Sequence, residues 1–415
     1  MMSPVLFYTI LFLLLFPYKL ISKDIEVSEN GKIKSLKEAL EISADGDEIL
    51  IREGRYFENN LLIEKHVKIT GTGNPVIDAN NISEIIRINC DGVEISGIIF
   101  KSVPVNFLHD LSAIRVENSD NVKVYNNTFE NCFFAIYLAN TNNSTVFSNT
   151  ITGNSVSESF SGNGIHLWNC NNITINDNKV KGQRDGIYFE FVKQSLIYNN
   201  TCNNNLRYGL HFMFSEGNSY KYNTFRENGA GVAVMYTKYV EMIGNTFENN
   251  WGSNSYGLLL KDIDKSTIKG NYFKKNTTAI YIEGSNGTTL LHNEFRDNGW
   301  AIKIMGDCYE DTISKNNFFN NSFDVATNSY SNPNTFINNY WDRYTGYDIN
   351  NDGTGDVPYR PVSLFSTVVQ NAPETILLMR SFIVDLLDIT EKVIPIFTPE
   401  TLSDNSPTLN PIKND

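Results

Sequence analysis

Residues 200–225 read NTCNNNLRYGLHFMFSEGNSYKYNTF and contain one full unit of a repeated pattern. It begins with an Asn-x-apolar unit at Asn200, continues with the alternating apolar residues Leu210 and Phe212, and returns to the same unit at Asn223. This pattern recurs about ten times along the chain, at intervals close to 22 residues. Such a period, combined with apolar residues at every second position, predicts a solenoid of short strands, a right-handed parallel β-helix.

Two features of the repeat set the expected register of neighbouring coils. The recurring Asn residues are Asn127, Asn149, Asn178, Asn200, Asn223, Asn245, Asn271, Asn293, Asn317 and Asn339. We expect them to stack at a bend, each side chain bonding the coils on either side. Two apolar rows, running from Ile114 to Ile302 and from Val116 to Ile304, are expected to point inward, with neighbouring coils about 4.8 Å apart.

The chain divides into four predicted segments. Residues 1–22 resemble a secretory signal, because an apolar run of about twelve residues is too short to span a bilayer. No basic residue precedes the run and no Ala-x-Ala site follows it, so an uncleaved anchor stays open as the alternative. The β-helix is expected over 23–341, a polar closing loop over 342–361, and a helical arm and tail over 362–415.

Composition and the chain ends restrict the function classes. The net charge of −13, without a basic patch, argues against nucleic acid as a partner. Five scattered cysteines argue against a disulfide framework. A short helix over 35–40 is expected to cover the N-terminal end of the core, as a solenoid requires.

The C-terminal arm is almost wholly apolar. A helix is expected over 374–395, with one narrow polar stripe and charges that argue against a membrane span. So wide an apolar face needs a cover. It either folds back over the C-terminal end of the solenoid or docks on a partner protein. The candidate docking residues are Leu378, Met379, Phe382, Ile383, Leu386 and Leu387.

Residues that alternate with the two inward rows form outward columns. One column reads His166, Tyr188, His211, Ala233, and the next reads Trp168, Glu190, Met213, Met235. Imidazole and thioether are soft ligands that suit copper. We therefore predict His211, Met213 and Met235 as metal ligands, with His166 second. The alternative is an outer packing patch, covered by a loop or by the arm.

Two further patterns allow other chemistry. Asp348, Asn350, Asp352 and Asp356 match the first positions of a Ca²⁺ loop, although Tyr359 stands where the bidentate Glu would be. Calcium and a plain Asp/Asn/Gly turn both stay open. Asp185 and Glu190 on one coil, with Arg184 and Arg207 nearby, are residue types that polysaccharide-cleaving or epimerising β-helices use.

Several strings together resemble the NosD family. They are Leu206–Ser215 (LRYGLHFMFS), Val234–Tyr236 (VMY), the closing loop from Tyr340 (YWDRYTGYD) through Tyr359, and Leu378–Phe382 with Thr398-Pro399. The closing loop and the tail are more specific than the repeats. The likeness extends from about Lys34 to Pro399.

The resemblance implies a non-enzymatic, exported accessory protein of nitrous oxide reductase maturation in denitrification. Such a protein works with an ABC transporter, made of a cytoplasmic ATPase and a membrane permease, to supply copper, or sulfur, to the reductase. The arm would then dock on the permease, holding the protein in the periplasm at the inner membrane, while the reductase and a copper-donor protein bind transiently. The alternatives are a polysaccharide lyase or epimerase and a purely structural subunit of the transporter.

Overall fold

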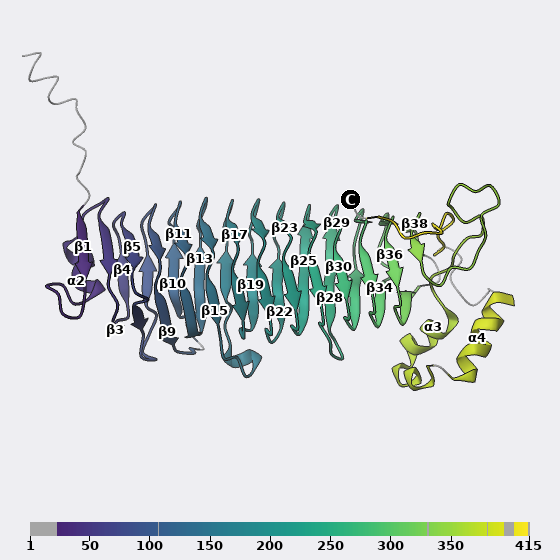
Figure 1. Cartoon of the computed structure of the whole chain (residues 1–415), viewed down its shortest axis with the longest axis horizontal. Helices are drawn as coiled ribbons and strands as arrows, with labels where there is room; N and C mark the ends of the chain where they lie inside the picture. The colour runs from purple at the N-terminus through teal and green to yellow at the C-terminus, as the bar shows by residue number, and fades with distance from the viewer. Residues whose placement is uncertain (1–22, 107, 330–331, 380, 394–401, 414–415) are drawn as a thin grey trace, which may run out of the picture.

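The computed structural model describes residues 23–106, 108–329, 332–379, 381–393 and 402–413, and they form one long rod (Figure 1). The expected signal segment, 1–22, lies outside the described residues. Within the described part of the chain, no helix is long and apolar enough to cross a membrane.

Each coil contributes one strand to each of three parallel sheets, so the predicted parallel β-helix is confirmed. Among the described residues, sheet A has 14 strands: β1 (Asp24–Val27), β2 (Glu48–Ile51), β5 (Lys68–Gly71), β8 (Glu94–Ser96), β11 (Lys123–Tyr125), β14 (Thr145–Phe147), β17 (Thr174–Asn176), β20 (Leu196–Tyr198), β23 (Ser219–Lys221), β26 (Glu241–Ile243), β29 (Thr267–Lys269), β32 (Thr289–Leu291), β35 (Thr312–Ser314) and β38 (Thr335–Ile337). Sheet B has 13 in the same described ranges: β3 (Arg55–Phe57), β6 (Val76–Asp78), β9 (Ile99–Val103), β12 (Thr128–Cys132), β15 (Thr150–Thr152), β18 (Lys179–Lys181), β21 (Thr201–Asn203), β24 (Thr224–Arg226), β27 (Thr246–Glu248), β30 (Tyr272–Lys274), β33 (Glu294–Arg296), β36 (Asn317–Phe319) and β39 (Tyr340–Trp341).

Sheet C follows sheet B in each coil and carries the predicted His and Met columns. Its 12 strands within the described residues are β4 (Leu61–Ile63), β7 (Ile86–Ile88), β10 (Ser112–Glu117), β13 (Phe134–Ala139), β16 (Ile165–Trp168), β19 (Asp185–Glu190), β22 (Tyr208–Met213), β25 (Ala230–Lys238), β28 (Tyr256–Asp264), β31 (Thr278–Glu283), β34 (Trp300–Ile304) and β37 (Phe323–Ala326). Leu210 pairs with Val232 and Phe212 with Val234, and all four side chains are buried in one continuous core.

The Asn residues form the expected ladder, with one correction. Asn200 donates its backbone N–H to the side-chain oxygen of Asn223, and Asn223 does the same to Asn245. Near the C-terminal end the ladder residue is Asn316, so the prediction of Asn317 is wrong by one position. Phe318 pairs with the core residue Phe295, and this pairing sets the register that puts Asn316 at the bend.

A second Asn ladder runs along another corner of the rod. Its buried members bond one another in the same way: Asn205, Asn228, Asn250, Asn276, Asn298 and Asn321. Each side-chain amide satisfies backbone groups that a sharp bend would otherwise leave without partners. The two ladders therefore hold the coils in register, and the register decides which outward side chains are neighbours.

The N-terminal end is covered as predicted. Helix α2 (Leu36–Ile42) begins at Ser35, whose hydroxyl accepts the Glu38 N–H at 3.1 Å. Leu36 and Ala39 lie in the core and cover its first coil. One short helix, η1 (Glu158–Phe160), lies in an insertion between sheets B and C.

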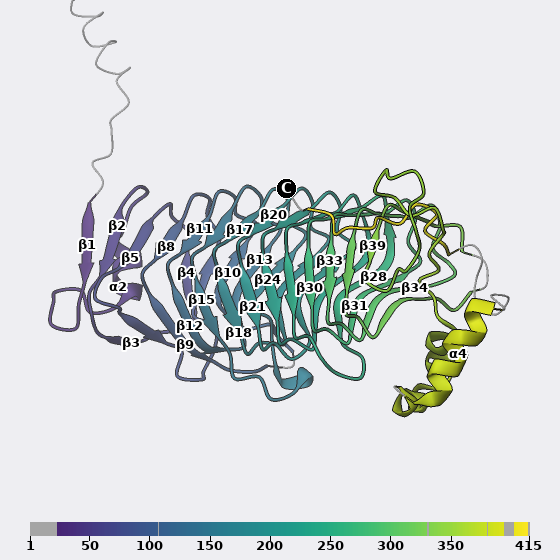
Figure 2. The same cartoon turned by 45° about the vertical axis from the view of Figure 1, so that its right-hand side comes forward.

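The arm differs from the single helix expected over 374–395, and that prediction is wrong. The described residues form α3 (Leu364–Asn371), the 3₁₀ helix η2 (Pro373–Leu378) and α4 (Phe382–Val393). The chain turns at Met379 because this side chain packs against an apolar cluster on the outer face of sheet C, around Trp300 and Phe323. Figure 2 shows α4 projecting from the side of the last coils.

The C-terminal tail returns to the solenoid and closes it. Leu402 is fully buried in the main core. The buried Asp404 carboxylate continues the Asn ladder, accepting the N–H groups of Asn338 and Asn339, the Asn339 amide and the Trp341 indole N–H. In Figure 1 the tail runs along the rod past β38. The tail and the closing loop thus cover the open end of the core.

Candidate metal centre

The structure has the two outward columns in the expected register. His166 pairs with Tyr188, and Tyr188 pairs with His211. In the next column Glu190 pairs with Met213, and Met213 pairs with Met235. Because the inward rows hold the flanking residues in the core, these side chains lie on the outer face of sheet C.

His211 is buried although it lies outside the core. Its ring packs against Tyr188 and Tyr208, with ring centroids 5.0 and 4.7 Å away, and the residue is 3% exposed. Neither ring nitrogen has a hydrogen-bond partner. The Asp185 carboxylate lies 3.6 Å from Nδ1. A buried imidazole with two free nitrogens is costly to keep, unless something binds it.

The two methionines lie beside His211 and are half-buried. Met213 is two residues from His211 on β22, and Met235 is the neighbour of Met213 on β25. Neighbouring strands are about 4.8 Å apart, and residues two apart on one strand are about 7 Å apart. Flexible thioether side chains can close such distances. One imidazole and two thioethers are a soft donor set, suited to Cu(I).

His166 is separated from this group. Its ring is stacked between Tyr137 and Tyr188, at 4.3 and 4.7 Å, so Tyr188 stands between the two histidines. The Nδ1 atom lies 2.9 Å from the Asn163 amide nitrogen. Burial lowers the pKa of His166 to about 3, so its ring is neutral at ordinary pH. His166 lies two coils from His211, and its role as a ligand stays a prediction.

Cysteine does not join the group. Desolvation raises the pKa of the Cys132 and Cys308 thiols to about 12, which disfavours the thiolate that binds metals. In the described part of the chain, no three His, Cys, Asp or Glu side chains gather as a ligand set. The candidate centre around His211 therefore depends on methionine ligands, and not on a set of His, Cys, Asp or Glu side chains.

A row of aromatic residues beside the methionines was not anticipated. Phe191, Phe214 and Tyr236 directly follow Glu190, Met213 and Met235, and each has a positive φ, near +50°. Their rings stack at 5.4 and 5.1 Å, and each residue is about 45% exposed. Equivalent positions on earlier coils hold Asn118, Asn140 and Asn169, which suit this conformation. The aromatic substitution at an Asn position is the sequence signal that identifies this row.

The closing loop holds its acidic residues in a self-contained turn. Asp348 accepts the N–H groups of Asp352 and Gly353, and Asp352 accepts the Thr354 N–H. Asp356 accepts the Ile349 N–H, and Asn350 donates to Asp352. These bonds are those of an Asp/Asn turn. Calcium binding here stays a prediction.

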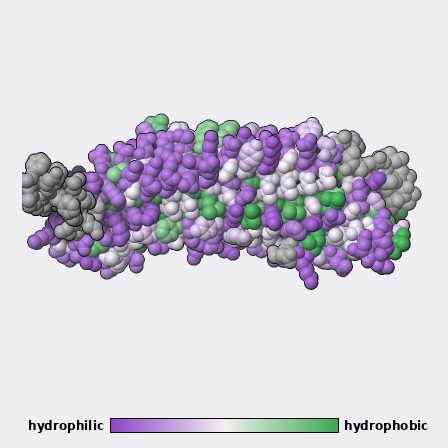
Figure 3. Space-filling view, turned by 90° about the horizontal axis from the view of Figure 1, so that it is seen from above, coloured by the Kyte–Doolittle hydropathy of each residue, from purple (hydrophilic) through white to green (hydrophobic). Residues whose placement is uncertain are grey.

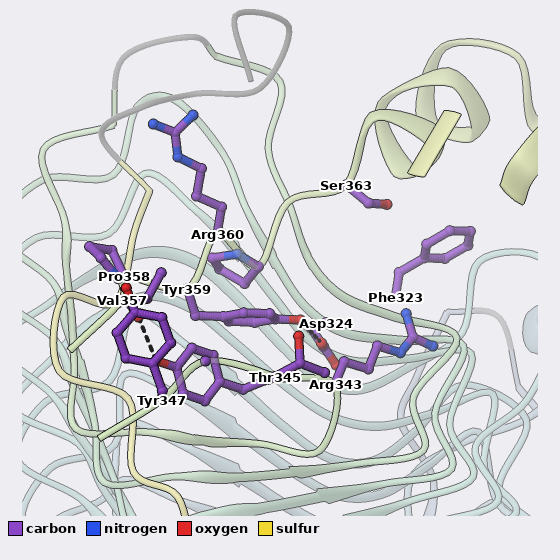
Figure 4. A pocket seen from close by; sticks show the side chains of 13 residues that line it. Phe323, Asp324, Arg343, Thr345, Tyr347, Val357, Pro358, Tyr359, Arg360 and Ser363 are labelled. Carbon is purple, nitrogen blue, oxygen red and sulfur yellow. Dashed lines mark hydrogen bonds between the residues drawn. The ribbon is translucent and has the colours of Figure 1, made fainter. Parts of the chain in front are cut away.

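Next to this turn lies a cavity of about 630 Å³ (Figure 4). Its walls include Tyr347, Arg343 and Tyr359, and the Tyr359 hydroxyl donates to Asp324 at 3.0 Å. The other Asp324 oxygen has no partner, and burial raises the pKa of this carboxyl to about 6. The closing loop thus builds a pocket as well as covering the core.

The structure divides the six predicted docking residues. Met379 and Leu387 pack against the cluster around Trp300 and Phe323. The other four are exposed: Leu378, Phe382, Ile383 and Leu386. The arm is therefore held on the side of the last coils and presents an apolar face outward. Elsewhere, a view from above shows mostly hydrophilic residues along the rod, with scattered apolar ones (Figure 3).

Comparison with known proteins shows similarity to one family. The family model NosD, described as a periplasmic copper-binding protein, matches residues 147–352. A relative from Stutzerimonas stutzeri, named probable ABC transporter binding protein NosD, is 25% identical over 388 residues, covering 89% of this chain and 88% of the relative. A relative of the same name from Pseudomonas aeruginosa is 26% identical over 390 residues, covering 89% and 90%.

A solved structure shows the fold alone. The catalytic domain of a GH87 α-1,3-glucanase superposes with a TM-score of 0.63 at 14% identity, covering 77% of this chain and 69% of the other. The family match over residues 147–352 and the two relatives that cover 89% of the chain agree with one another. Together these similarities support membership of this chain in the NosD family.

Proposed function

We propose that this protein is a periplasmic accessory protein that binds copper as cargo and works with an ABC transporter in nitrous oxide reductase maturation. The observation that carries the proposal is the grouping of His211, Met213 and Met235 on two neighbouring strands. The family description and the relatives' names support periplasmic copper binding and a transporter partner. A copper-donor protein would deliver the copper, and this protein would then pass copper, or sulfur, to the reductase. Both partners would bind transiently.

The geometry suits binding and release of a soft ion. The ladders fix the three backbones, so the donors are brought together without rearranging the coils. His211 supplies one nitrogen, and the half-buried methionines supply sulfurs at the edge of the solvent. Thioether ligands are soft donors that suit Cu(I), and they are neutral. Releasing the ion on transfer therefore leaves no ligand charge behind.

Cu(I) competition against a chromophoric chelator tests the cargo. We expect the purified protein to take up Cu(I), and the double variant His211→Ala, Met213→Ala to lose affinity at least tenfold. His109→Ala, in the loop before β10, is the matched control and should leave affinity unchanged. Unchanged affinity in the double variant would reject the site.

The apolar face of the arm is proposed to dock on the permease. Truncation would also remove residues 402–413, which close the core, so substitutions are the better test. Phe382→Ser with Leu386→Ser should abolish co-purification with the permease and ATPase, while Ile82→Ser, an equally exposed apolar residue on the solenoid, should not. If the arm variant and the Ile82→Ser control both still co-purified with the permease, the arm would not be the docking surface.

A polysaccharide lyase or epimerase remains the competing class. Its support is the buried Asp185 and His211 pair with Tyr188 and Tyr208 around it, since such enzymes use acidic, imidazole and phenol groups. Release of unsaturated uronate from alginate or pectin, with Cu(I) affinity unchanged in the double variant, would favour this class. A purely structural subunit would bind the permease and no copper.

A further inference from the structure

The Asp185 side chain is the least satisfied charged group near the candidate metal centre. It is fully buried, and one carboxylate oxygen accepts the Tyr208 N–H at 3.2 Å. The other oxygen, Oδ2, has no hydrogen-bond donor. A buried carboxylate oxygen without a donor is energetically unfavourable, so its surroundings should supply a partner.

Two cationic or protonatable groups face Oδ2. His211 Nδ1 lies at 3.6 Å and Arg184 Nε at 3.8 Å. Both atoms are themselves buried without partners. The Arg184 side chain is about one-third exposed and can turn its guanidinium toward water, whereas His211 is enclosed by Tyr188 and Tyr208. A shift of less than 1 Å would bring Nδ1 within hydrogen-bond distance of Oδ2.

The position of Asp185 comes from the register. Asp185 pairs with Tyr208 on the next strand, so its carboxylate lies diagonally across from His211. Comparable positions on later coils hold uncharged residues, Ala230 on β25 and Thr278 on β31. The fold therefore does not require a charge at this position of the coil. The charge of Asp185 must be explained by its own neighbours.

We infer that Asp185 is the positioning residue of His211: its Oδ2 accepts the Nδ1–H, which fixes the neutral tautomer that presents the Nε2 lone pair to the metal ion. The inference rests on the proposed copper site. A carboxylate that holds the far nitrogen of a metal-binding imidazole orients the ring and makes the free nitrogen a better donor. Tyr188 and Tyr208, packed on the ring, prevent it from turning away.

The substitution Asp185→Asn separates this role from simple packing. Asn has the same shape and can still accept the Tyr208 N–H. Its amide N–H₂, however, would face Nδ1 as a donor, which favours the tautomer with the proton on Nε2. The metal-binding lone pair would then be occupied by that proton. We expect Cu(I) affinity to fall about 10- to 100-fold, the range typical when such a partner is lost.

The first measurement needs no metal. Nitrogen-15 NMR of the apoprotein, with the His211 signals identified by their absence in His211→Ala, should show the proton on Nδ1 in the parent and on Nε2 in Asp185→Asn. Glu283→Gln removes a carboxylate from β31 of the same sheet, away from the site, and should change neither the tautomer nor the affinity, which excludes a general charge effect.

Each outcome is decisive. A parent protein with the proton on Nε2 would overturn the inference even if Asp185→Asn failed to fold. The inference would also be overturned if a folded Asp185→Asn variant kept the parent tautomer and affinity while His211→Ala lost affinity. That result would leave the proposed function intact. A tautomer that switches as expected, with Cu(I) affinity unchanged in both variants, would support the positioning role and reject the copper site.

Discussion

At the scale of single residues, the buried acid of the closing-loop cavity is the clearest case of a perturbed group. Asp324 is 3% exposed, and burial raises its pKa to about 6, although the Tyr359 hydroxyl donates to it. The unfolded chain has an Asp pKa near 3.9. The folded protein therefore binds this proton more tightly, and the resulting stability is present below about pH 4 and is lost as the pH rises through 6.

Asp324→Asn should remove this pH dependence. An amide oxygen can still accept from Tyr359, and no charge is buried at neutral pH. We expect the free energy of unfolding at pH 7 to exceed that of the parent by up to about 3 kcal/mol, and the two to converge near pH 4. Urea denaturation at several pH values measures this. The exposed Asp385→Asn is the control, and a variant less stable than the parent at pH 7 would contradict the assignment.

At the scale of an element, the Asn ladder carries the register of neighbouring coils. The side-chain oxygen of Asn223 accepts both the backbone N–H and the amide of Asn200. Its own amide donates to the Ile197 carbonyl and to Asn245, all at about 3.0 Å. Each Asn thus connects three coils, and its bonds are buried.

Asn223→Ala should be strongly destabilising for this reason. Four hydrogen bonds are lost and buried groups on two coils lose their partners, so we expect the free energy of unfolding to fall by about 2–4 kcal/mol. Asn203→Ala, on the outward face of β21, should lie within about 0.5 kcal/mol of the parent. Equal effects in thermal or urea unfolding would show that the ladder contributes no more than a surface amide.

At the scale of the whole molecule, a rod-shaped core is exposed wherever its last coil has no neighbour. Here the tail provides the cover: Leu402 is buried, and Asp404 accepts four hydrogen bonds from the last coil. The arm therefore leaves the solenoid after the closing loop and re-enters it at 402. Its two ends are both anchored, which holds the exposed face of α4 in a defined direction.

Asp404→Ala should loosen one end of the rod. The donors of Asn338, Asn339 and Trp341 lose their acceptor, so amide hydrogen exchange should speed up in β35, β38 and β39 by at least tenfold. Exchange in β2 and β11, at the other end, should stay at the parent rate, because coils contact only their neighbours. The exposed neighbour Asn405→Ala is the control. Uniform acceleration along the rod would contradict this local role.

The solenoid, its N-terminal cover and the outward columns could be predicted from the amino-acid sequence, since a period near 22 residues sets which side chains become neighbours. It even placed Met213 beside Met235, because that contact follows from the repeat alone. It misplaced Asn317, where two adjacent Asn residues fit the pattern and only the pairing of Phe318 with Phe295 chooses between them.

Features that the repeat does not encode could not be predicted, because they depend on contacts made in the folded molecule. The diagonal approach of Asp185 to His211 depends on how side chains of two strands lean across a sheet. The return of Asp404 to Asn339 joins residues 65 positions apart, through an arm that has no period. Contacts at the repeat distance can be counted along the chain, whereas these depend on side-chain packing and on the path of the whole backbone.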